Sequence, residues 1–138
     1  MAVEAQLEWT REMQFIGRAG QGPGVILDSP EGGSGTSPMA LMLIGVAGCS
    51  GMDVVSILKK KRSTFSGLTV RIRGERQDAY PKRYSAVQIE FVVRGDGVKP
   101  GDVEKAIELS MNKYCGAIAS LNAEVTHSYR ILAAEAEA

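Results

Sequence analysis

The sequence predicts an α+β fold, in which antiparallel sheets accompany a long central helix. Two observations support this prediction. Segments in which apolar and polar residues alternate, as in half-buried strands, occur near both ends and in the middle of the chain. A long apolar segment and a shorter amphipathic segment, both with residues that begin helices, separate those strands. The order is therefore strands, long helix, two strands, helix and strand, and the 138 residues suit a single domain, 1–138.

Three short strands are expected before the long helix. Residues 3–10 alternate Val, Ala, Leu and Trp with polar neighbours, and residues 12–17 and 24–28 are the next two candidates. The glycines and the proline of residues 17–24 predict a turn between these two candidates. Arg18 is expected to lie in that turn.

The long helix is expected to run from about Pro38 to about Arg62. Ser37 is a suitable N-cap, and proline is favoured at the first helical position. Four basic residues at 59–62 would lie at the helix C-terminus, where the macrodipole favours positive charge. Two further strands, at 67–76 and 85–95, flank a turn at Tyr80–Pro81 and predict an antiparallel hairpin. The remaining predictions are a helix over 99–115, a short helix over 116–122 and a strand over 123–132.

The segment GVAGCSGMD, residues 45–53, places Cys49 among three glycines inside the predicted long helix. Each glycine costs about 1 kcal/mol relative to alanine in a helix interior. Because residues four apart share a helix face, Cys49 lies on one stripe with Gly45 and Asp53. The glycines either leave space beside the thiol for another element or a small substrate, or they allow tight packing with Cys49 as a small core residue. Helix geometry alone does not separate these two interpretations.

Composition narrows the classes of function. A net charge of zero implies no general attraction to nucleic acid or to an anionic membrane. The continuous apolar run of the long helix is shorter than the roughly 18 residues of a membrane span. The first residues also lack the features of a signal peptide, so we expect a cytoplasmic protein.

The two cysteines are the main chemical feature of the chain. There is no CxxC pair and only one histidine, so no metal is expected. In a reducing compartment a permanent disulfide is not expected, and the two thiols are either inert core residues or a redox pair.

Two segments resemble one known family. SPMALMLIGVAGCSGMDVVSILKKKR resembles the first cysteine helix of the OsmC/Ohr family of small peroxide-detoxifying proteins. MNKYCGAIASLNAEVTHSYRI resembles the second cysteine motif and closing strand of that family, and the order of elements matches over nearly the whole chain. The resemblance is closer to the OsmC-like branch of unassigned role than to the well-studied hydroperoxide reductases.

This resemblance implies a thiol-dependent peroxidase that needs no metal or flavin. Cys49 would reduce organic or fatty-acid hydroperoxides and become a sulfenic acid, which Cys115 would resolve by forming a disulfide. An external dithiol, such as a protein-bound lipoyl group or a small thiol, would then restore both thiols. The family uses an arginine from the early turn to favour the reactive thiolate, and Arg18 matches that position.

The family also implies an intertwined homodimer with active sites at its interface. The substrate pocket would then contain apolar side chains, each of which is also a candidate for plain core: Phe15, Met39, Met42 and Met52. One position departs from the reductase pattern, in which a glutamate after the helix-starting proline orients the arginine. Met39 and Ala40 stand there instead, and Asp53 or Glu31 are the possible replacements. The alternative function is therefore a redox-responsive or small-ligand-binding relative without efficient peroxidase activity.

Overall fold

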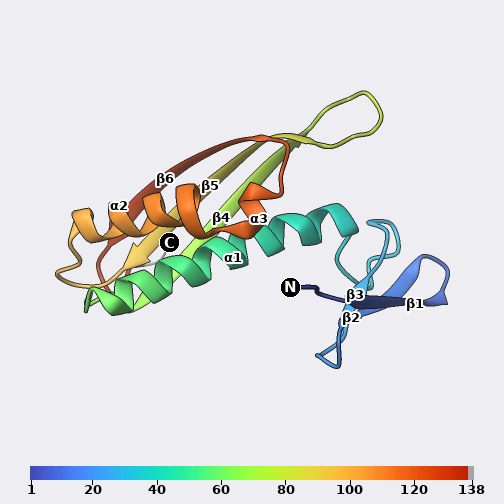
Figure 1. Ribbon diagram of the computed structural model, residues 1–138, viewed down its shortest axis with the longest axis horizontal. Helices are drawn as coiled ribbons and strands as arrows, with labels where there is room; N and C mark the ends of the chain where they lie inside the picture. Colours follow the sequence, from blue (N-terminus) through green and yellow to red (C-terminus); the bar gives the residue numbers. More distant parts are fainter. Residues whose placement is uncertain (137–138) are drawn as a thin grey trace. The chain divides into compact units, whose positions relative to one another are not determined.

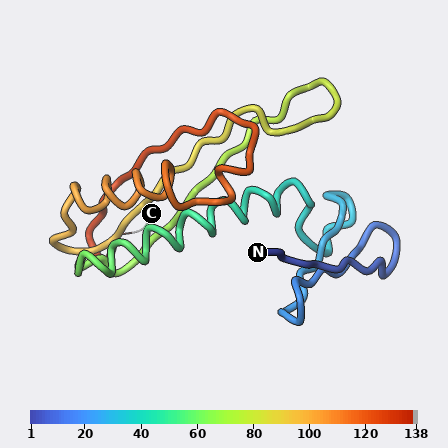
Figure 2. The backbone as a smooth tube through the Cα atoms, in the orientation of Figure 1, coloured from blue at the N-terminus to red at the C-terminus, as the bar shows by residue number. Residues whose placement is uncertain are grey.

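The structure is a computed structural model that describes residues 1–136 (Figures 1 and 2). The chain forms two compact units, Met1–Met42 and Leu43–Ala138. The boundary between them falls inside helix α1, Pro38–Lys60, so one continuous helix belongs to both units. The expectation of a single domain over residues 1–138 stays a prediction.

The N-terminal unit contains an antiparallel sheet of strands β1 (Ala5–Arg11), β2 (Gln14–Ala19) and β3 (Val25–Leu27). The three predicted strands are therefore confirmed. The sequence prediction was wrong about Arg18, which lies in β2 opposite Gln6 rather than in the following turn. The period-2 pattern of the strand continues through Arg18, and the chain turns only at Gly20, whose φ of 54° favours glycine.

Helix α1 begins and ends with recognisable caps. The Ser37 Oγ accepts a hydrogen bond from the Ala40 N–H at 3.3 Å, which confirms Ser37 as the N-cap. At the other end Arg62 adopts a left-handed φ of 56°, and the Ser63 N–H donates to the Leu58 carbonyl at 3.0 Å. This Schellman-type arrangement ends α1 at Lys60, within two residues of the predicted end.

The larger unit contains a second sheet, in the order β4–β5–β6. Strands β4 (Gly67–Arg76) and β5 (Tyr84–Arg94) form the predicted antiparallel hairpin. Strand β6 (Glu124–Leu132) pairs with β5 in parallel, so the antiparallel arrangement does not extend to this edge. Parallel neighbours need a long crossover, and the helical segment between β5 and β6 provides it.

Helices α1 and α2 (Pro100–Leu109) lie against one face of this sheet (Figure 1). On that face Val54 and Leu58 of α1 are fully buried. The predicted apolar face of β5 is confirmed, and the core includes these residues: Val87, Ile89, Phe91 and Val93 from β5, with Val103, Ala106 and Ile107 from α2. The core therefore forms between one sheet and two helices.

After α2 the helix widens into a π-helical turn, η1 (Ser110–Tyr114), before the short helix α3 (Gly116–Ala119). The Cys115 N–H donates to the Ser110 carbonyl, five residues earlier, at 2.9 Å. The predicted helix over 99–115 is present, but its periodicity did not reveal the wider final turn. Such turns insert one extra residue and re-aim the residues that follow, and they are frequent at functional sites.

Much of the apolar surface of α1 is exposed in the single chain. Ile44 and Met52 are 55% and 76% exposed, and they line an apolar groove of about 890 Å³ beside β4. By length and composition alone α1 could cross a membrane, because its 23 residues include a window with a mean hydropathy of 1.9. That window is 28% buried in the structure. The helix nevertheless supplies Val54 and Leu58 to the core, as the central helix of a globular unit does.

Candidate functional site

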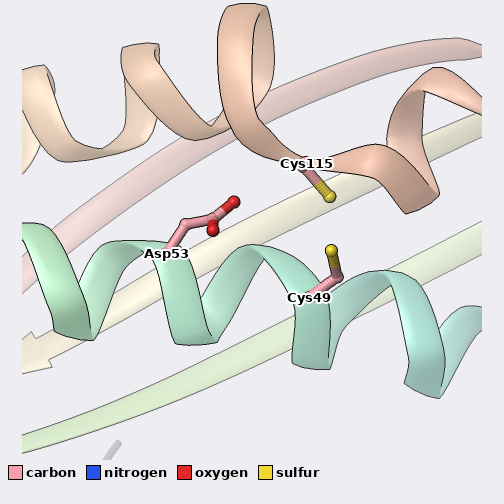
Figure 3. Close-up of side chains that lie close together, drawn as sticks. All are labelled: Cys49, Asp53 and Cys115. Carbon is pink, nitrogen blue, oxygen red and sulfur yellow. The ribbon is translucent and has the colours of Figure 1, made fainter. Parts of the chain in front are cut away.

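Cys49 of α1 and Cys115, which follows η1, point toward each other across the space between the helical segments (Figure 3). Asp53 lies one helical turn after Cys49 on the same side of α1. The two sulfur atoms and a carboxylate oxygen of Asp53 all lie within 4.8 Å of one another. Both cysteines are free thiols in this structure. The fold therefore brings together two residues that are far apart in the sequence and that the sequence had singled out.

The two thiols differ in their surroundings. Cys49 is half-buried, whereas Cys115 is 5% exposed. Burial raises the pKa of the Cys115 thiol, and a hydrogen bond from the Ile118 N–H to its sulfur at 3.5 Å only partly opposes that shift. The neighbouring Cys49 raises the pKa of Cys115 further. Cys115 is therefore a protonated thiol at neutral pH, and Cys49 is the more accessible of the two.

A chain of hydroxyl groups fixes Asp53. The Ser110 Oγ donates to the Asp53 Oδ2 at 2.9 Å, and the Ser110 and Ser50 hydroxyls are 2.9 Å apart. Both serines are fully buried, so these hydrogen bonds tie α1 to η1 in the core. Sequence reasoning missed both serines. The available signal was a hydroxyl next to Cys49 in an apolar helix, which must find a partner if it is buried.

The three glycines around Cys49 have open space or ordinary contacts where a side chain would stand. Within the part of the chain that the structure describes, a Cβ on Gly45 or Gly48 would meet no atom within 4 Å, apart from the backbone of the helix itself. A Cβ on Gly51 would make an ordinary 3.4 Å contact with Val70. Packing within the larger unit, as far as the structure describes it, therefore does not require these glycines. This observation favours the interpretation that they leave space for another element or a small molecule.

Arg18 belongs to the N-terminal unit, whereas both thiols belong to the larger unit. Its guanidinium group lies over Gly24, where a Cβ would come within 3.1 Å of the Arg18 Nη1. Arg18 also lines a small cavity of about 210 Å³ on the sheet of its own unit. Its predicted action on Cys49 stays a prediction.

The four predicted pocket residues are also divided between the units. Phe15, Met39 and Met42 belong to the N-terminal unit, and only Met52 belongs to the larger one. Met52 lines the apolar groove beside β4. Of the two proposed partners for Arg18, Asp53 is already engaged by Ser110, and Glu31 is exposed in the loop before α1.

The fold and the paired thiols define a class of protein. The sequence model of the OsmC-like protein family matches residues 31–130, and the chain belongs to that family. Among its relatives, Protein YhfA of Escherichia coli is 33% identical over 134 residues, which cover 96% of this chain and 100% of YhfA.

Solved structures agree with this placement. A hypothetical protein from Aquifex aeolicus is 30% identical, with a TM-score of 0.81 over 95% of this chain and 98% of its own. The organic hydroperoxide resistance protein OhrB of Bacillus subtilis is 12% identical, with a TM-score of 0.62 over 94% of this chain and 98% of its own. At that identity the likeness to OhrB establishes the shared fold alone.

Proposed function

We propose that the protein is a thiol-dependent peroxidase that reduces organic hydroperoxides, including those of fatty acids. The single observation that carries this proposal is the pair of free thiols that face each other within 4.8 Å. Membership of the OsmC-like family supports a peroxide-related redox role, and a relative of the same fold is named for organic hydroperoxide resistance.

In the proposed reaction the Cys49 thiolate attacks the O–O bond of the hydroperoxide. It becomes a sulfenic acid, and the other peroxide oxygen leaves as an alcohol. The Cys115 thiol then attacks the sulfenic sulfur, forms the Cys49–Cys115 disulfide and releases water. An external dithiol, of the lipoyl type, or a small thiol then reduces the Cys49–Cys115 disulfide by thiol–disulfide exchange and is itself oxidised. Both cysteines return to free thiols.

The order of the two cysteines follows from their surroundings. A peroxide can reach the half-buried Cys49 more readily than the buried Cys115. The raised pKa of Cys115 also makes it a poor nucleophile toward free peroxide at neutral pH. Once a sulfenic acid forms on Cys49, Cys115 is already within reach and needs no large movement.

We further propose that two copies of the chain form a homodimer that covers the exposed apolar surfaces. The groove beside β4 and the exposed Gly45 and Gly48 of α1 would receive the second copy. In that assembly Arg18 would favour the Cys49 thiolate, and the substrate pocket would include Phe15, Met39, Met42 and Met52. Sedimentation equilibrium at low micromolar concentration should give the dimer mass, and a folded monomer there would contradict the assembly.

We further propose that the protein is cytoplasmic.

A second candidate function rests on Met39. The residue after Pro38 carries no carboxylate, so the arginine-orienting glutamate of the reductase branch is missing. A redox-responsive or ligand-binding protein could keep the thiol pair without fast peroxide turnover.

Stopped-flow measurement of the reduced protein with cumene hydroperoxide separates the two candidates. The peroxidase should consume the hydroperoxide much faster than free cysteine does, and Cys49→Ser should abolish this activity. Cys115→Ser is the matched control, because it should complete one turnover and leave a sulfenic acid that dimedone traps. Wild-type consumption no faster than that of free cysteine would favour the second candidate.

A further inference from the structure

We propose that Cys49, Asp53 and Cys115 also form a binding site for a thiophilic divalent cation of the Zn²⁺ type. The three ligand atoms, two sulfurs and one carboxylate oxygen, lie within 4.8 Å of one another. In a tetrahedral zinc site, with Zn–S bonds of about 2.3 Å and Zn–O bonds of about 2.0–2.2 Å, ligand atoms lie roughly 3.5–3.8 Å apart. Small rotations of the three side chains close that difference. This inference is independent of the proposed peroxidase activity.

The hydrogen bonds around the cluster suit a metal site. Ligating carboxylates and thiolates are usually held by hydrogen bonds from outside the ligand set. The Ser110 hydroxyl occupies the Asp53 Oδ2, which leaves the other carboxylate oxygen available for a cation. The Ile118 N–H donates to the Cys115 sulfur and would stabilise its thiolate. Ser50 completes this arrangement through its buried contact with Ser110.

The carboxylate end of the cluster borders a cavity. This cavity, of about 350 Å³, is lined by Asp53 together with Leu109, Tyr114, Lys60 and Lys61. Three protein ligands with an open fourth position are typical of zinc sites that keep a water molecule. Two thiolates and a carboxylate carry three negative charges against two on the cation, and Lys60 and Lys61 line the cavity that borders Asp53.

The donor set selects among cations. Thiolate ligands favour Zn²⁺ and its heavier analogue Cd²⁺, whereas Mg²⁺ and Ca²⁺ prefer oxygen ligands. The sequence had predicted no metal because it has no CxxC pair and a single histidine. A CxxC motif detects ligands that are close in the sequence. Here the contact between α1 and η1 brings Cys115 from a distant segment to Cys49 and Asp53. Because metal and disulfide require the same two sulfur atoms, bound cation and the Cys49–Cys115 disulfide exclude each other.

The test is a titration of the full, reduced chain with Cd²⁺ after the reductant has been removed under anaerobic conditions. Cadmium–thiolate absorption in the ultraviolet should saturate at one cadmium per chain, and Zn²⁺ should displace the cadmium. Asp53→Asn should keep the absorption and weaken the affinity by about tenfold or more. Cys49→Ser and Cys115→Ser should each lose about half of the absorption, because one thiolate ligand is missing in each.

Glu108→Gln is the matched control, since it removes one negative charge from an exposed position of α2 and should leave the affinity unchanged. Saturation at half a cadmium per chain, or equal affinity in wild type and Asp53→Asn, would overturn the proposal. If Asp53→Asn does not fold, Ser110→Ala keeps all three ligands and should weaken cadmium binding several-fold. Unchanged affinity in that variant would overturn the proposal equally. A wild type that reduces peroxide but does not bind cadmium would refute the metal site and leave the peroxidase proposal intact.

Discussion

Sheets β1–β2–β3 and β4–β5–β6 each contain three strands, but the burial of their apolar side chains differs. In β5 the residues Phe91 and Val93 are fully buried beneath the two helices. In β1 every residue is exposed, and Trp9 is 65% exposed. Both strands show the same alternation of apolar and polar residues. The pattern therefore marks a surface that is able to be buried, and the presence of a covering element decides whether it is buried.

The largest expected effect is in the core of the larger unit. Phe91→Ala should lower the free energy of unfolding by about 3–5 kcal/mol, because it removes a fully buried ring. Trp9→Ala is the matched change in the exposed sheet and should cost much less in the isolated chain. Urea denaturation at several protein concentrations measures both variants. A loss from Trp9→Ala as large as that from Phe91→Ala, growing with concentration, would mean that a second copy covers β1.

The next effect concerns the hydroxyls that join α1 to η1. Ser110→Ala leaves the Asp53 carboxylate and the Ser50 hydroxyl without their buried partner, and should cost about 1–3 kcal/mol of folding free energy. Ser120→Ala is the control, since the Ser120 hydroxyl donates to the Gly116 carbonyl at an exposed position. Thermal unfolding compares the two variants. Equal melting temperatures would show that this contact contributes little to the larger unit.

A third prediction asks whether the two units act together at the thiols. If Arg18 favours the Cys49 thiolate, Arg18→Met should slow the alkylation of Cys49 by iodoacetamide at pH 7 several-fold. Arg18→Lys should keep part of the rate, because it retains the charge but not the planar guanidinium group. The labelling is done in a Cys115→Ser background, so that Cys49 is the thiol that reacts. Equal rates with arginine, methionine and lysine at position 18 would show that Arg18 does not act on Cys49.

The smallest expected effect is in the loop before α1. Hydrogen bonds from the Ser34 hydroxyl and from backbone N–H groups hold the pKa of Asp28 below its usual value. Because the pKa is lower in the folded state, this contribution is present above about pH 4. It is lost as the pH falls through the folded value. Hydrogen exchange of the Ser34 amide should therefore lose protection on acidification, and Asp28→Asn should remove the pH dependence. Protection that is constant with pH would contradict this role.

The sequence by itself determined most of the local structure. Ser37 and Pro38 fixed the start of α1, and the alternation in residues 85–95 fixed the buried face of β5. The two cysteine motifs identified the thiols that matter, because each lies in a segment with a specific and recognisable pattern.

Only the tertiary structure decided how these segments meet. The parallel pairing of β6 and the widened turn η1 have no signal in any single segment. The Ser50 hydroxyl signals only that a buried partner is needed, and the fold decides that the partner is Ser110, which also holds Asp53. The physical reason is that periodicity reports which face of an element is apolar, but not which distant element covers that face. The side chains of Cys49, Asp53 and Cys115 come together because α1 and the α2–η1 segment share the same sheet. That contact depends on the packing of the whole unit.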